Sequence, residues 1–162
     1  MRGKRMLVAA TLGLATLPGV LAAQVQQAIQ SELRLDAIFA HTSAVQAAYG
    51  FTVPAGVYVR SGLVAGIGVG RHGVEGRTDL IARFSLDPFR QSRWAPYAGA
   101  GLSGRYRSEL DGGSRAYLLV FVGFEGPLPL GGTSGWVPAL ELGLGGGGRV
   151  GVIMRKGINA RR

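Results

Sequence analysis

Charged and apolar residues alternate along this chain, and the pattern is clearest at residues 77–87. Successive side chains of an extended strand point to opposite faces. One face therefore carries Thr78, Leu80, Ala82, Phe84 and Leu86, and the other carries Arg77, Asp79, Ile81, Arg83, Ser85 and Asp87. The first face is apolar and the second largely ionic. The pattern restricts the chain to a sheet whose two faces meet very different surroundings.

Eight segments of this kind follow one another, separated by turn residues. They are 32–40, 44–53, 57–70, 77–87, 94–107, 115–125, 136–145 and 149–158. Their spacing suits transmembrane strands of about 9 to 11 residues joined by short hairpins. We therefore expect an eight-stranded antiparallel up-and-down transmembrane β-barrel. The sixth segment is apolar on both faces, so the sequence leaves its inward set open.

The first 23 residues have the pattern of a cleavable secretory signal peptide. Three basic residues precede an apolar stretch at 6–20, and small residues suitable for cleavage follow. An uncleaved anchor is the alternative, but the stretch is shorter than the ~20 residues of a spanning helix. We expect residues 24–162 to form a single exported barrel domain with its N-terminus in the periplasm.

The amino-acid composition excludes several kinds of site, membrane anchor and partner. The chain of 162 residues has no Cys, so it has no disulfide, no thiolate metal site and no cysteine for a lipoprotein anchor. After the leader no apolar run is long enough for a spanning helix, so membrane insertion requires closed strands. Three of the 18 basic residues lie in the leader and all nine acidic ones follow it, which leaves a net charge of about +6. Because the basic residues are scattered, we expect no nucleic-acid partner.

The ionic faces of the segments predict a charged barrel interior. Its expected members are Arg34, Arg60, Arg77, Arg83, Arg105, Arg107, Arg149 and Arg155 with Asp36, Asp79, Asp87, Glu125 and Glu141. Side chains just fill an eight-stranded barrel, so these charges must pair or retain water. A structural ion-pair network that plugs the lumen is the favoured interpretation, and a narrow polar path for small solutes is the alternative.

A nine-residue pattern occurs twice. WAPYAGAGL at 94–102 and WVPALELGL at 136–144 share Trp, Pro, Gly and Leu at identical offsets, 42 residues apart. In an up-and-down barrel this interval spans one hairpin, so both Trp residues should begin strands at the same end. Trp at that position is typical of the aromatic belt at a membrane interface, and Pro is tolerated where a strand begins.

Residues 93–102, RWAPYAGAGL, follow a strand and a turn that contains Asp87-Pro88-Phe89. This segment resembles the "PYVGAGLG"-type strand of small OmpA-like and OmpW-like outer-membrane barrels, most closely over residues 77–107. The resemblance implies a non-enzymatic outer-membrane barrel with the 87–93 turn in the periplasm. It also implies contact with the barrel-insertion machinery. Proteins of this kind usually end on an aromatic residue, whereas this chain ends on Arg162.

Three motifs resemble sites that carry chemistry. Gly68-Val-Gly70-Arg-His-Gly73 matches the dinucleotide fingerprint, but no strand–helix–strand rhythm follows it. His41-Thr42-Ser43 is similar to the His-x-Ser pair of lipid A deacylases, yet it sits at a turn, and no acidic residue lies between Asp36 and Glu75. His72 and the aspartates lack metal-site spacing. We expect no catalytic, cofactor-binding or metal-binding residue.

The expected function is that of a non-enzymatic outer-membrane barrel, with a structural or small-solute porin-like role. Its partners would be outer-membrane lipid and lipopolysaccharide, met by rim residues such as Arg71 and Arg115. The first alternative is a soluble periplasmic barrel of lipocalin type, which would turn its apolar faces inward around a ligand. The second is a lipid A-modifying enzyme. The sequence leaves oligomeric state open.

Overall fold

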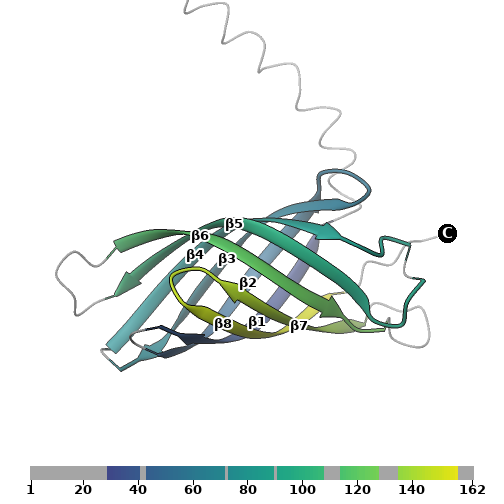
Figure 1. Cartoon of the computed structure of the whole chain (residues 1–162). Coiled ribbons are helices and arrows are strands. Elements are labelled where there is room, and N and C mark those ends of the chain that lie inside the picture. Colours follow the sequence, from purple (N-terminus) through teal and green to yellow (C-terminus); the bar gives the residue numbers. More distant parts are fainter. Residues whose placement is uncertain are drawn as a thin grey trace, which may run out of the picture.

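The chain forms a single closed β-barrel. The computed structural model describes residues 29–40, 43–71, 73–89, 91–107, 114–127 and 135–156, and these contain eight strands and no helix. The strands are β1 (Gln30–Phe39), β2 (Ala44–Pro54), β3 (Val59–Gly70), β4 (Gly73–Ser85), β5 (Ala95–Arg107), β6 (Ser114–Glu125), β7 (Trp136–Leu144) and β8 (Gly148–Lys156). Each strand pairs antiparallel with the next, and β1 pairs with β8 (Figure 1). The predicted eight-stranded antiparallel barrel is confirmed.

The barrel has two distinct ends. Because the strands alternate in direction, β1 begins and β8 ends at the same end, which we call the terminal end. The hairpins β1–β2, β3–β4, β5–β6 and β7–β8 turn at the opposite, distal end. There β5 pairs with β6 as far as Ser114, whereas β7 pairs with β6 only from Val120 to Glu125. The β5–β6 hairpin therefore extends beyond β7 (left side of Figure 1).

Seven of the eight strands lie within two residues of their expected bounds at both ends. The fourth is the exception, because residues 71–76 were expected to form a loop and β4 instead begins at Gly73. Gly70 pairs with Gly73, whose φ of +97° lies in a region that L side chains rarely adopt. That glycine permits a tight turn, so β4 begins four residues earlier than expected, and Glu75 lies within it.

The repeated Trp-x-Pro pattern has a structural explanation. The two copies lie at the starts of β5 and β7, both at the terminal end. The N–H of Leu86, just after β4, donates to the proline carbonyl of the first copy (3.0 Å). The N–H of Gly126, just after β6, donates to the proline carbonyl of the second (2.7 Å). Each copy thus closes a hairpin at the barrel rim, where the missing proline N–H is tolerated.

Burial alternates residue by residue along the strands. On β8, for example, Arg149, Gly151, Ile153 and Arg155 are interior, while Val150, Val152 and Met154 face outward. On β6, whose faces the sequence left open, Leu119, Phe121, Gly123 and Glu125 are interior. A small apolar cluster lies within the lumen, and its members are Ala48, Val64, Ile81, Tyr97, Leu119, Phe121, Ala139 and Ile153. The remaining interior is mostly charged.

Candidate functional site: the charged lumen

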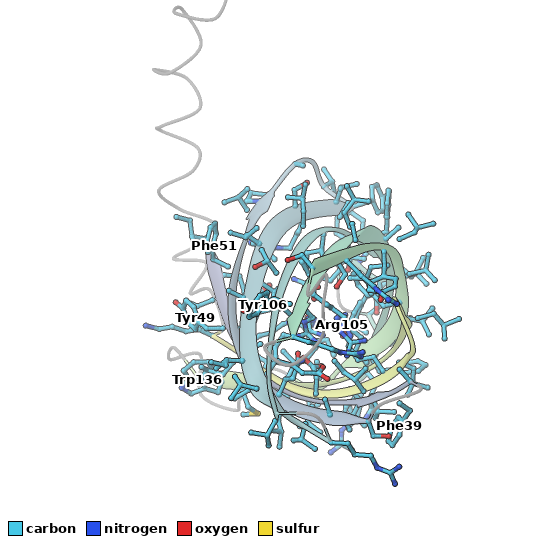
Figure 2. All side chains as sticks on the ribbon, turned by 90° about the vertical axis from the view of Figure 1, so that its left-hand side faces the viewer. Phe39, Tyr49, Phe51, Arg105, Tyr106 and Trp136 are labelled. Carbon is cyan, nitrogen blue, oxygen red and sulfur yellow. The ribbon has the colours of Figure 1, made fainter. Side chains whose placement is uncertain are left out.

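Twelve acidic and basic side chains are buried in the barrel. The basic ones are Arg34, Arg77, Arg83, Arg105, Arg149 and Arg155, and the acidic ones are Glu32, Asp36, Glu75, Asp79, Glu125 and Glu141. They come from β1, β4, β5, β6, β7 and β8, so they converge on the lumen from most of the wall. In Figure 2 the labelled Arg105 points into the barrel, while Phe39, Tyr49, Phe51 and Trp136 point away from it.

Six of these side chains form a closed ring of alternating charge, which we call the central ring. Its members, in order around the ring, are Arg34, Asp36, Arg77, Asp79, Arg149 and Glu141. Nitrogen–oxygen distances are 3.5 Å for Arg34–Asp36, 2.5 Å for Asp36–Arg77, 3.0 Å for Arg77–Asp79, 2.8 Å for Asp79–Arg149 and 3.0 Å for Arg149–Glu141. The contact between Glu141 and Arg34 completes the ring. No side chain in it is more than 5% exposed.

The ring crosses the lumen because its members stand on opposite walls. Arg34 and Asp36 lie on β1, whereas Arg77 and Asp79 lie on β4; β7 and β8 supply Glu141 and Arg149. Each charge has two neighbours of opposite sign, which offsets the cost of removing it from water. The ring therefore places paired side chains across the lumen.

A second cluster lies between the central ring and the terminal end. Arg155 contacts Glu32 (3.1 Å) and Glu125 (2.9 Å), and its guanidinium lies over the ring of Tyr97, 4.5 Å from the centroid. The Tyr97 hydroxyl donates to Glu141 (3.2 Å), so this cluster is joined directly to the central ring. Arg83 is on the same side, 3.5 Å from Glu32 and 5.5 Å from the Tyr97 centroid.

A third cluster lies toward the distal end. Glu75 contacts Arg105 (2.8 Å) and Arg107 (3.0 Å). Arg105 also donates to the carbonyl oxygen of Gly146 (3.0 Å) in the β7–β8 turn. Gly146 has φ +68°, and a Cβ atom there would meet the ring of Tyr117. Arg105 therefore ties the β7–β8 turn to β5.

The outer surface has the opposite character. Large apolar side chains are exposed on all eight strands, among them Leu35, Tyr49, Ile67, Leu80, Leu102, Leu118, Val122, Leu142 and Val152. Leu118 is 71% exposed. Trp94 and Trp136 are exposed at the terminal end, as the repeat predicted. An apolar outer wall around an ionic interior is the inverse of a water-soluble globular protein.

Most of the predicted interior set is confirmed. Of the residues expected there, Arg34, Arg77, Arg83, Arg105, Arg149, Arg155, Asp36, Asp79, Glu125 and Glu141 are buried, and Arg107 pairs with Glu75. Arg60 is half-buried near the terminal end, where it donates to the hydroxyl and carbonyl of Thr52. Asp87 was expected in the interior, but it lies beyond β4, where its carboxylate accepts from the N–H groups of Gln91 and Ser92.

Two interior carboxylates were not predicted, although both follow the alternation of the strands, in which every second residue shares a face. Glu32 lies two residues before Arg34, and Glu75 lies two residues before Arg77. Glu32 contacts three guanidiniums, those of Arg34, Arg83 and Arg155. Glu75 falls within residues 71–76, which the sequence predicts to be a connection. The strand alternation was the available signal in both cases.

The glycine motif lies in the barrel wall. Gly68 and Gly70 lie within β3 and Gly73 begins β4, so no helix opens at the glycine motif and a dinucleotide site of that type is excluded. His41, Thr42 and His72 lie outside the described residues. Among the residues described, no group of three or more His, Cys, Asp or Glu side chains could hold a metal ion. Within the same part of the chain, no helix has the length and apolarity needed to cross a membrane.

The chain was also compared with known proteins. No protein-family model matches it, and no curated protein has a significantly similar sequence.

Proposed function

We propose that this protein is a non-enzymatic outer-membrane β-barrel whose lumen is closed, and that its role is that of a structural membrane scaffold. The observation that carries the proposal is the inversion of polarity. Apolar side chains cover the outside of all eight strands, while ion pairs occupy the interior. A lipid bilayer solvates such an outer wall, and closed strands satisfy the backbone polar groups within it.

Two features support a location in the outer membrane. The leader has the composition of an export signal, and both exposed Trp residues lie at one end of the barrel, as in an interfacial aromatic belt. On this proposal the terminal end faces the periplasm and the distal hairpins face outward. Rim residues such as Arg71 and Arg115, both exposed, then meet the phosphates of lipopolysaccharide.

The interior argues against two other roles. A carrier of apolar ligands needs an apolar cavity, and this lumen is crossed by the central ring. An open porin needs a continuous aqueous channel, whereas eight-stranded barrels are filled by their own side chains. We therefore favour the scaffold role over the small-solute path.

The first test is gel mobility of the protein from outer-membrane fractions, with and without boiling. We expect the protein in that fraction and a heat-dependent shift in mobility, because a closed barrel resists detergent until heated. Recovery in the soluble periplasmic fraction without a shift would refute the proposal. Solute entry into liposomes that contain the protein is a second test. Entry faster than into empty liposomes would reject the closed lumen.

A further inference from the structure

Gln46 carries a wholly buried amide on the inner face of β2. Its exposed fraction is 0%, and neither its Oε1 nor its Nε2 atom has a hydrogen bond to any described residue. A side-chain amide has two donor hydrogens and two acceptor lone pairs. Burying such a group without hydrogen bonds is costly, so buried polar side chains are nearly always bonded to protein or to ordered water. The amide of Gln46 therefore indicates a polar ligand inside the barrel.

The register of the strands places Gln46 between the central ring and the third cluster. Gln46 pairs with Asp36, a member of the ring, and on its other side with Gly68. Gly68 in turn pairs with Glu75 of the third cluster. A Cβ atom at Gly68 would lie 2.7 Å from Cγ of Gln46, so the Gln46 side chain lies against Gly68. Because glycine has no side chain, none from β3 stands between Gln46 and Glu75 in this row.

The wall around Gln46 provides no side-chain partner for the amide. The neighbouring inward positions of β2 and β3 hold only alanine and glycine, and they are Ala44, Ala48, Gly66, Gly68 and Gly70. None of these residues has a polar side-chain atom. Hydrogen-bond partners of the amide must therefore come from across the lumen or from a bound molecule.

Arg77 supplies a second unbonded group beside the amide. Its Nη2 atom donates to Asp36 (2.5 Å), and Asp36 and Gln46 are cross-strand neighbours on β1 and β2. The guanidinium is thereby held beside Gln46, yet its buried Nη1 atom has no hydrogen bond. A donor of Arg77 and the donor and acceptor of the amide thus lie in the same part of the lumen without bonding to one another.

The unmet hydrogen bonds are confined to one part of the interior. Among the described residues, the buried side-chain atoms without a hydrogen bond belong to Gln46, to members of the central ring, and to Glu75 and Arg105 of the third cluster. The second cluster, around Arg155 and Glu32, has none as far as the structure describes it. This distribution indicates a local ligand and not loose packing throughout the barrel.

We propose that Gln46 and Arg77 bind ordered water between the central ring and the third cluster. Water molecules both donate and accept, so they can donate to Oε1 of Gln46 and accept from its Nε2 and from Nη1 of Arg77. A charged ligand fits less well, because every member of the central ring already has neighbours of opposite sign. The bound water joins the ring to the third cluster by hydrogen bonds. The proposal requires only the barrel fold, so it stands or falls separately from the scaffold role.

The test is NMR of the full-length protein, folded in detergent micelles. Magnetisation transfer from water to the side-chain NH₂ of Gln46 is measured in the laboratory frame and in the rotating frame. A long-lived bound water gives cross-peaks of opposite sign in the two experiments, whereas hydrogen exchange gives the same sign in both. We expect the bound-water result at Gln46 and at the Nε–H of Arg77.

The internal control is the Nε–H of Arg155, which donates to Glu32 (3.1 Å) and should show no bound-water cross-peak. If Gln46 shows no such cross-peak either, the proposal fails. Equal cross-peaks at Gln46 and Arg155 would also overturn it, because the water would then not be specific to this site.

Matched variants test whether Gln46 holds the water. Gln46→Leu removes both polar atoms at similar volume and should abolish the cross-peak at Arg77, whereas Gln46→Asn keeps an amide and should retain it. Thr52→Val is the control, because Thr52 is also buried on the inner face of β2 but lies toward the terminal end. A cross-peak at Arg77 that survives Gln46→Leu at full strength, or that is lost equally in Thr52→Val, would overturn the proposal. If Gln46→Leu does not fold, the spectrum of the unmodified protein decides.

Discussion

The contacts of Glu141 in the central ring allow the stability cost of removing its charge to be predicted. This carboxylate contacts Arg34, Arg149 (3.0 Å) and the Tyr97 hydroxyl (3.2 Å), and it is buried. Glu141→Gln removes its charge and leaves two buried guanidiniums with fewer partners. Removing one member of a buried ion pair typically costs about 3–5 kcal/mol. Because Arg34 keeps Asp36 and Arg149 keeps Asp79, we expect a loss near the lower limit, about 3 kcal/mol.

A double-mutant cycle tests whether the ring acts as a unit. Glu141→Gln and Arg149→Gln remove two ends of one ion pair, so their costs should be non-additive by about 1–3 kcal/mol. Arg105→Gln is the control, because Arg105 pairs with Glu75 and has no ion pair with Glu141. Its cost should add to that of Glu141→Gln within about 0.5 kcal/mol.

The assay is equilibrium unfolding in urea with the barrel in lipid vesicles, followed by fluorescence of Trp94 and Trp136, the two tryptophans of the chain. The linear dependence on urea gives the free energy of unfolding for each variant. The reasoning is refuted if Glu141→Gln costs less than about 1 kcal/mol, or if the Glu141 and Arg149 substitutions are simply additive.

Two further substitutions test the two faces of the wall, with the same assay. Leu142→Arg should cost about 2–4 kcal/mol if its outward side chain lies near the bilayer midplane, whereas Leu86→Arg, beyond the end of β4, should cost about 0–1 kcal/mol; equal costs would contradict the assigned depth. Gly123→Ala should destabilise the barrel by about 1–3 kcal/mol, because the new methyl group would meet the Tyr97 ring and overpack the lumen. Gly76→Ala is its control, with nothing nearer than 4.0 Å to the new Cβ, and a similar cost there would show that lumen crowding is not the cause.

The faces of the strands could be predicted because they depend on local alternation alone. On β4, Arg77, Asp79 and Arg83 share the interior as the sequence pattern indicated. The alternation by itself does not say which face is inside. The Trp positions and the glycines beside the charges favoured the correct choice, since small residues relieve crowding inside a narrow barrel.

The partners of each charge could not be predicted. Arg34 meets Glu141, 107 residues away, and Arg155 meets Glu32, 123 residues away. Such pairs depend on the tilt and stagger of the strands around the barrel, which local patterns do not encode.

The central ring joins strands that are far apart in the sequence, and this affects how the barrel assembles. Its members lie on the first, fourth, seventh and eighth strands, so the ring is incomplete until nearly the whole chain has been added. A partly assembled sheet would expose Arg34 and Asp36 without their later partners, and in the hydrocarbon core such charges are costly. Insertion and closure should therefore be concerted, with the last hairpin neutralising the first strand as the seam between β1 and β8 forms.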